Sequence, residues 1–279
     1  YTKMSKLNAN PNEVFGFPIE NKTKEVLQNN KKYFCRFLNK KCDKQSRTIP
    51  YPMGVCSVNH SHNKPIICPH RFLENSLVFR DVAKNAFGSV NNVLLFSEVK
   101  LSNVGSFDFV LVKHKPISSK IENFCIVEFQ SDSTTGTGKL VDVLKDFMNG
   151  ENVSNNKYAF GLNTYNTIKL SYIQMLIKGQ VMEKWDKQIY WIMQKYVFDN
   201  MVNRFKLMEM DFDKTNKTKF LIYDLFKNDD FYNLKLVEKK SSTISNLLKA
   251  FTHQPTPSLD DFLKILENKI NLKLGLSIE

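Results

Sequence analysis

Apolar and polar positions divide the chain into helix-like and strand-like stretches. Apolar residues at helical spacing predict helices at residues 23–37, 72–88, 139–149, 167–185 and 259–274. Short apolar runs bounded by turn residues predict strands at residues 93–101, 107–113, 124–130, 157–162 and 189–197. The middle of the chain therefore reads as helix, three strands, helix, strand and helix, which predicts an α/β fold with a mixed central sheet flanked by helices.

The two ends of the chain differ from this middle part. Residues 1–71 hold six of the nine prolines and one predicted helix, so we expect them to be irregular, to bury little and to need a staple such as a metal. Beyond residue 200 only the helix at 259–274 stands out. We therefore predict an N-terminal lobe (1–71), a core (72–200) and a mixed C-terminal extension (201–279) that serves dimerisation or DNA contact.

Each of the three consecutive strands carries an acid among apolar residues: Glu98, Asp108 and Glu128. Side chains alternate along a strand, so Glu128 and Gln130 share a face while Cys125 points the other way. Three unpaired acids on neighbouring strands are costly to bury. A divalent cation with oxygen ligands, Mg²⁺ above all, would offset their charge.

Such a site suits phosphodiester hydrolysis, in which bound Mg²⁺ activates a water and clamps phosphate oxygens. Asp108 and Glu128 would be direct metal ligands, and Glu98 would hold a second metal or a metal-bound water. Gln130 would orient the attacking water. The alternative is that the acids lie at strand ends, solvated or paired with lysines.

The formal charge of +12 favours a polyanionic partner, although a merely lysine-rich composition would also produce it. Lysines and aromatics interleave at residues 30–37, and Lys44, Gln45 and Arg47 lie in a polar loop that could contact DNA. The loop that contains Gly136 and Gly138 lacks the Lys-Ser/Thr ending of a nucleotide-binding loop, so we expect no nucleotide to bind there. The chain has no apolar run of transmembrane length and no apolar signal region, so we expect a cytoplasmic protein with no membrane partner.

Four of the five cysteines, Cys35, Cys42, Cys56 and Cys68, cluster in the first quarter of the chain. In a reducing compartment such a cluster indicates metal rather than disulfides, although no Cys-x-x-Cys pair is present. Four thiolates in tetrahedral coordination would suit Zn²⁺ or iron. Three histidines are substitute ligands or simply loop residues: His60, His62 and His70.

The layout resembles the PD-(D/E)XK nuclease fold, whose motif is an Asp on one strand and Glu-x-Lys on the next. The matching residues are Asp108 and Glu128-Phe129-Gln130, and Gln130 stands where most of the superfamily has Lys. A closer resemblance, to the NotI-type restriction endonucleases, spans roughly residues 13–195. It rests on Glu13-Val-Phe-Gly-Phe-Pro18, the four clustered cysteines, Phe96-Ser-Glu98-Val99, Asp108, Glu128-x-Gln130, Gln174-Met-Leu-Ile-Lys-Gly179 and Trp185.

This resemblance implies a homodimeric type II restriction endonuclease that cuts double-stranded DNA within a short palindrome. It also implies that Glu-x-Gln is a usual form of the motif, that one structural iron is held by the four cysteines, and that a cognate DNA methyltransferase belongs to the same system without being a stable subunit. Zn²⁺ remains chemically equal to iron. The alternatives are a non-catalytic, sequence-specific DNA-binding protein with a structural metal, and a repair or structure-specific nuclease of the same fold.

Overall fold

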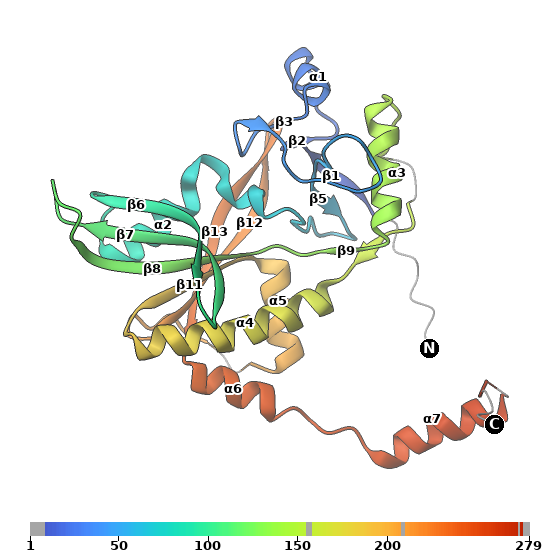
Figure 1. Ribbon diagram of the computed structural model, residues 1–279. Helices are drawn as coiled ribbons and strands as arrows, with labels where there is room; N and C mark the ends of the chain where they lie inside the picture. Colours follow the sequence, from blue (N-terminus) through green and yellow to red (C-terminus); the bar gives the residue numbers. More distant parts are fainter. Residues whose placement is uncertain (1–8, 155–157, 208–209, 273, 276–279) are drawn as a thin grey trace.

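The computed structural model of the chain describes residues 9–154, 158–207, 210–272, 274 and 275. Its central sheet has six strands in the order β13-β12-β11-β8-β7-β6 (Figure 1). They are β6 (Val93–Leu101), β7 (Gly105–His114), β8 (Ile121–Gln130), β11 (Gln188–Gln194), β12 (Thr218–Asn228) and β13 (Phe231–Ser242). Strand β11 runs parallel to β8 and β12, and the other pairs are antiparallel. The predicted mixed α/β sheet is confirmed.

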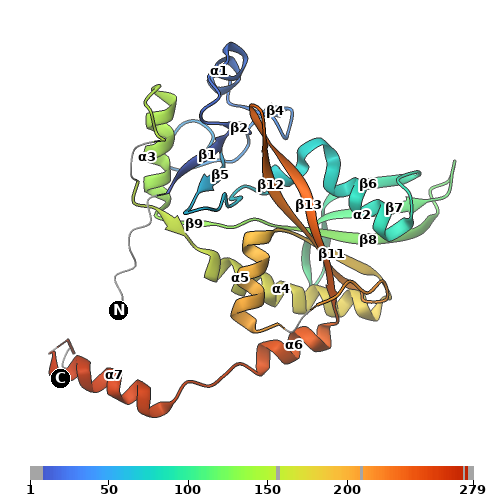
Figure 2. The same ribbon diagram turned by 180° about the vertical axis from the view of Figure 1, so that it is seen from behind.

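Helices cover both faces of this sheet (Figure 2). On one face lie α4 (Thr164–Lys184), α5 (Lys195–Phe205) and α6 (Ile244–Thr252), and their apolar residues share a buried cluster with Trp191 and Ile126 of the sheet. On the other face, α2 (Leu77–Phe87) packs on Cys125 and Val127. Consecutive residues of β8 thus feed opposite cores, as the alternation of side chains along a strand requires.

Two predicted helices are shorter than their apolar pattern indicates. The helix expected at 72–88 is a 3-10 helix, η1 (Pro69–Ser76), followed by α2, because Asn75 and Ser76 take left-handed conformations with φ of 49° and 54°. The helix expected at 23–37 is α1 (Lys24–Lys31), where the Thr23 side chain caps the Val26 amide. The chain then turns at Tyr33 into a small hairpin of β3 (Phe34–Cys35) and β4 (Lys40–Lys41).

The strand expected at 157–162 does not join the central sheet. Only β10 (Gly161–Leu162) forms, and it pairs with β9 (Thr134–Thr135) at the end of the polar loop. Residue 157 lies outside the described residues. Strand β11 ends at Gln194 because α5 begins at Lys195, so the expected strand at 189–197 was too long. The long hairpin of β12 and β13 was missed altogether and continues the sheet beyond residue 200.

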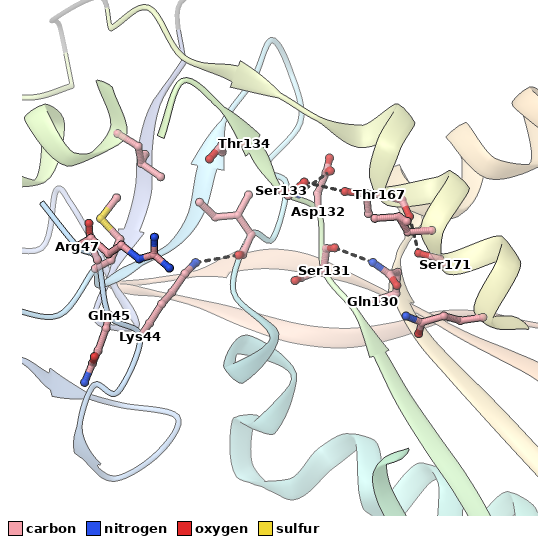
Figure 3. A pocket seen from close by; sticks show the side chains of 16 residues that line it. Lys44, Gln45, Arg47, Gln130, Ser131, Asp132, Ser133, Thr134, Thr167 and Ser171 are labelled. Carbon is pink, nitrogen blue, oxygen red and sulfur yellow. Dashed lines mark hydrogen bonds between the residues drawn. The ribbon is translucent and has the colours of Figure 1, made fainter. Parts of the chain in front are cut away.

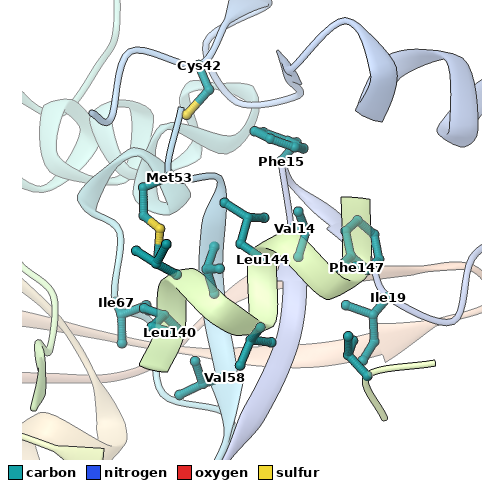
Figure 4. Packing of buried hydrophobic residues seen from close by; sticks show 14 of the residues in the cluster. Val14, Phe15, Ile19, Cys42, Met53, Val58, Ile67, Leu140, Leu144 and Phe147 are labelled. Carbon is teal, nitrogen blue, oxygen red and sulfur yellow. The ribbon is translucent and has the colours of Figure 1, made fainter. Parts of the chain in front are cut away.

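The N-terminal segment is far more ordered than its prolines suggest. Strands β1 (Asn10–Val14), β2 (Phe17–Pro18) and β5 (Val55–Asn59) form an antiparallel sheet in the order β2-β1-β5. Helix α3 (Thr137–Met148) covers this sheet with Leu140, Leu144 and Phe147 (Figure 4). The expectation of an irregular segment that buries little was wrong, because α3 supplies apolar surface from elsewhere in the chain.

A buried charge cluster joins this lobe to the central sheet. The Arg71 guanidinium on η1 lies 3.1 Å from the Glu13 carboxylate of β1 and 3.0 Å from that of Glu74, and it donates to the Tyr232 carbonyl of β13 at 2.8 Å. All three charged side chains are almost wholly inaccessible to solvent. Buried charges persist only when they are paired and hydrogen-bonded, so this cluster fixes the lobe against β13.

No helix in the described part of the chain is long and apolar enough to cross a membrane.

Candidate active site

Asp108 lies where strands β7 and β8 separate. The last regular pair is Phe109 with Val127, and beyond it the Asp108 Oδ2 accepts a hydrogen bond of 2.9 Å from the Phe129 amide. The alternation of β7 breaks at the same point, because Phe107 packs in the core beneath α4 and Phe109 in the core beneath α2. The Asp108 carboxylate therefore replaces a backbone acceptor and holds the two strand ends at a fixed separation.

Glu128 is the buried acid of the site, with 3% of its surface exposed. Burial, and secondly the negative charge of Asp108, raise the pKa of the Glu128 carboxyl to about 7. Oε2 of Glu128 lies 2.8 Å from a lysine ammonium, whereas buried Oε1 has no hydrogen-bond partner among the described residues. The repulsion between the two carboxylates and the unpartnered Oε1 are the features that a bound cation would relieve.

The lysine is Lys178 on α4. Its ammonium donates to the Ser106 carbonyl at 2.8 Å as well as pairing with Glu128, and it lies 5.5 Å from the centre of the Phe107 ring. No role is predicted for this residue from the sequence alone. The available signal was its position on the buried face of the helix, three residues after Met175 and four before Met182. A lysine on such a face needs a buried partner.

Glu98 lies on the neighbouring strand but in a different environment. Its place in β6 falls between the pairs Ser97–Phe109 and Val99–Phe107, so it stands opposite Asp108. Its backbone is left-handed, with φ of 53°, and its side chain is exposed. The acids thus occupy three adjacent strands. Asp108 and Glu128 influence one another electrostatically, and Glu98 lies towards solvent at the edge strand.

Gln130 lies at the end of β8 and faces a pocket of about 720 Å³ (Figure 3). Its side-chain amide donates to the Ser131 carbonyl at 3.0 Å. One wall of the pocket is the loop from Lys44 to Arg47, and another is α4 with Gln174. Lys44 is anchored by a 3.0 Å hydrogen bond to the Ile67 carbonyl. The pocket thus joins the polar loop of the N-terminal lobe to the strand that carries Glu128.

The four clustered cysteines are all buried and reduced. Burial, and after it the charges of the other thiols in the cluster, raise the pKa of Cys35 and raise that of Cys42 to about 11. The Cys56 thiol donates to the Gly54 carbonyl at 3.4 Å, and its interaction with the Cys68 sulfur raises the pKa of Cys56 and lowers that of Cys68. These interactions show that segments up to 33 residues apart bring the four thiols near one another.

The histidines separate into two groups. The pKa of His70 is raised by its hydrogen bond to Cys68, and its ring lies 3.4 Å from the Asp43 carboxylate. His60 instead packs its ring on Tyr196, away from the cysteines. Over the residues that the structure describes, no three or more His, Cys, Asp or Glu side chains form an arrangement that could hold a metal ion. The four-cysteine metal site is therefore not supported by the arrangement of these side chains.

By comparison with known proteins, the chain is a type II site-specific deoxyribonuclease, an enzyme whose substrate is double-stranded DNA. Residues 20–234 match the family described as restriction endonuclease NotI, and the chain belongs to this family. No curated protein matches the chain. The match confirms the family predicted from the sequence and favours the enzyme over a non-catalytic DNA-binding protein. It also runs through β12 into β13, well beyond residue 195, where the resemblance read from the sequence ended.

Proposed function

We propose that this restriction endonuclease hydrolyses phosphodiester bonds of double-stranded DNA, with Mg²⁺, at a site formed by Asp108, Glu128 and Lys178. The observation that carries the proposal is the placement of Asp108 and Glu128 at the point where two adjacent strands separate. The same features support a core of the PD-(D/E)XK type. In that fold an Asp on one strand and a Glu-x-Lys variant on the next meet in this way, and Glu98 on β6 is the third acid of the proposed site.

The two carboxylates fit Mg²⁺, which takes a few carboxylate oxygens and completes its shell with water and substrate phosphate. Oε1 of Glu128 is the atom left for the ion, since Oε2 is taken by Lys178. The hydrogen bond that Asp108 accepts from the Phe129 amide fixes its carboxylate in position for the same ion. When bound, Mg²⁺ supplies a more acidic water and neutralises charge on the scissile phosphate.

Lys178 takes the place of the cation that Gln130 cannot supply. Its ammonium reaches the carboxylate cluster from α4 instead of from the strand, and it holds Glu128 in one orientation through a charge-assisted hydrogen bond. It also lowers the repulsion between Glu128 and Asp108. Gln130, in the pocket beside these groups, orients the attacking water once substrate displaces its bond to the Ser131 carbonyl.

The DNA follows the pocket between the 44–47 loop and α4. Arg47 extends into this space (Figure 3), and arginine and glutamine are the side chains that best read base edges in the major groove. The net charge of +12 supports binding to a polyanion. A homodimer with twofold symmetry would place two such sites on the two strands of a palindrome. A cognate methyltransferase protects the host DNA as a separate protein.

The proposed active site is tested by cleavage of a library of genomic DNA with Mg²⁺. Wild type is expected to give discrete fragments, and Asp108→Asn and Glu128→Gln are expected to give none. The matched control is Glu122→Gln, an exposed acid on the same strand as Glu128, which should cut like wild type. Undiminished cleavage by either active-site variant would overturn the assignment, and unspecific degradation by wild type would indicate a nuclease without sequence specificity.

The four cysteines are proposed to bind one structural metal ion, iron or Zn²⁺. The burial of the four thiols and their mutual electrostatic influence support this, and the donor set suits either ion, although the described side chains are not arranged as a closed metal site. A cytoplasmic location, where thiols stay reduced, would keep these cysteines available as metal ligands. Elemental analysis of the purified protein tests the metal, and a visible absorption band would distinguish ferric iron from zinc. Protein without stoichiometric metal, yet with an unchanged melting temperature in chelator, would overturn the proposal.

A further inference from the structure

Helix α7 (Leu259–Asn271) is amphipathic, yet none of its residues is buried. Ser258 caps the helix by accepting a hydrogen bond from the Asp261 amide, so the helix has a defined start. Large apolar residues recur along one side at helical spacing, each at least 39% exposed: Leu259, Phe262, Leu263, Leu266 and Ile270. Figures 1 and 2 both show α7 apart from the rest of the chain, at the end of an extended segment that follows α6. A stable apolar stripe of this kind requires a partner surface.

Helix α4 carries a second apolar stripe in addition to the face that it buries. Leu170, Ile173 and Ile177 follow one another at intervals of three and four residues and are 65%, 47% and 47% exposed. The opposite side of the helix buries Tyr172, Met175 and Met182 against the sheet. The helix is therefore apolar on two faces, and only one of them is covered by its own chain.

The charges of the two helices are complementary. Helix α7 has three acids, Asp260, Asp261 and Glu267, against two lysines, a net charge of −1 in a chain whose total is +12. The exposed side of α4 instead carries Lys169 and Lys184. An acidic first turn is unsuited to a DNA backbone and suited to a protein surface that presents lysines. This argues for the dimerisation role among those expected of the C-terminal extension.

We propose that α7 of each chain docks on the α4 stripe of a second copy, so that two chains exchange their C-terminal helices. The extended segment at 253–258 leads α7 away from its own body, where a second copy can receive it. The exchange is reciprocal, as twofold symmetry requires. Covering both stripes in both chains would bury on the order of 1,500 Å² in total, the size of a standard stable interface. Leu170 also lines the pocket proposed for DNA, so a docked α7 would lie at the edge of that pocket. The proposal rests on the homodimer of the proposed function, but not on the metal chemistry of its active site.

The test measures the mass of the full-length protein in solution by light scattering during gel filtration. Wild type is expected to be a dimer at micromolar concentration. Leu266→Lys on α7 and Ile173→Asp on α4 are each expected to be monomers, because each places a charge in both reciprocal contacts. Asn268→Lys, an exposed polar position on α7, is the matched control and should remain dimeric. Circular dichroism checks that every variant retains its fold.

Mixing distinguishes helix exchange from any other dimer. In a mixture of the Leu266→Lys and Ile173→Asp proteins, one contact of the mixed dimer is fully wild type and the other pairs Lys with Asp. The mixture is therefore expected to recover dimer that neither protein forms alone. A monomeric wild type, a dimer that survives both substitutions, or a mixture that stays monomeric would each overturn the proposal. The active-site variants Asp108→Asn and Glu128→Gln are expected to stay dimeric in the same experiment, which keeps a failure of the active-site assignment distinguishable from a failure of the helix exchange.

Discussion

Lys178 on α4 and Glu128 on β8 form a buried ion pair with 2.8 Å between Nζ and Oε2. Only 7% and 3% of the two side chains are exposed. The pair links the helix that walls the pocket to the strand that carries Glu128, one of the proposed metal ligands. A change in the position of α4 would therefore be transmitted directly to the carboxylate.

Lys178→Met is expected to reduce the rate of DNA cleavage about a hundredfold or more, because it removes a preorganised positive charge from the reacting centre. Lys178→Arg keeps the charge and should retain a measurable part of the rate, although its planar group fits the site less well. The measurement is the single-turnover rate on plasmid DNA at saturating Mg²⁺. Lys84→Met, which changes an exposed lysine on α2, is the control. Equal rates for the Met and wild-type proteins at position 178 would show that the pair is only structural.

Arg47→Ala is expected to weaken binding to the recognition sequence by about 1–3 kcal/mol, with a smaller effect on unrelated DNA, if this side chain reads a base edge. Binding is measured by fluorescence anisotropy in an Asp108→Asn background, so that the DNA stays intact. Lys41→Ala, an exposed lysine in the preceding hairpin, should weaken binding to both DNAs equally or not at all. An equal loss on both DNAs for Arg47→Ala would assign this arginine to the phosphate backbone.

Arg71→Met is expected to lower the free energy of unfolding by about 3–5 kcal/mol, because Glu13 would remain buried without its cation and Glu74 would keep only Arg36, at 3.7 Å. The N-terminal lobe should loosen from β13 first, since the Tyr232 carbonyl also loses its donor. Urea denaturation gives the energy, and hydrogen exchange identifies the region. Lys84→Met on the exposed side of α2 should change the free energy by less than about 0.5 kcal/mol. A loss of similar size in both variants would refute the buried-cluster account.

Lys219 is expected to make stability rise with pH. Burial lowers its pKa to about 8, whereas in the unfolded chain a lysine titrates near its ordinary value of about 10.4. Between these values the unfolded chain holds more protons than the folded protein, so the free energy of unfolding increases with pH, by at most about 1.4 kcal/mol per pH unit.

Buried thiols such as Cys42 have raised pKa values and act in the opposite direction, so the difference between wild type and Lys219→Met is the quantity to measure. Urea denaturation from pH 7.5 to 10 should give a difference that grows with pH in favour of wild type. A constant difference would mean that Lys219, with its bonds to the Asp213 and Lys214 carbonyls, titrates normally.

The three acidic strands were predictable because they are local: β6, β7 and β8 are consecutive, short-looped and antiparallel. Strands β12 and β13 were not predicted, although the apolar run at 220–226 and the polar turn at 227–230 are the pattern of a β-hairpin. The packing of the N-terminal lobe could not be predicted from the sequence either, because Leu140 and Leu144, which cover its sheet, lie more than 80 positions after β5. The role of Lys178 could not be predicted for the same reason, because its partner Glu128 lies 50 positions earlier on another element.

The pocket of Figure 3 separates the loop proposed to read the DNA from the residues proposed to cut it. The loop that carries Gln45 and Arg47 runs from the end of β4 to the start of β5. None of Asp108, Glu128 and Lys178 belongs to it. It approaches the cleavage machinery only across the pocket, at Gln130 and α4. The proposed functions of specificity and hydrolysis thus lie on separate covalent segments. Residues 44–47 are the replaceable part of the loop, because Cys42, Ile49 and Met53 on either side are buried in the N-terminal lobe. Exchanging it between family members, while keeping the Lys44 bond to the Ile67 carbonyl as an anchor, is the direct route to a nuclease with a new target sequence.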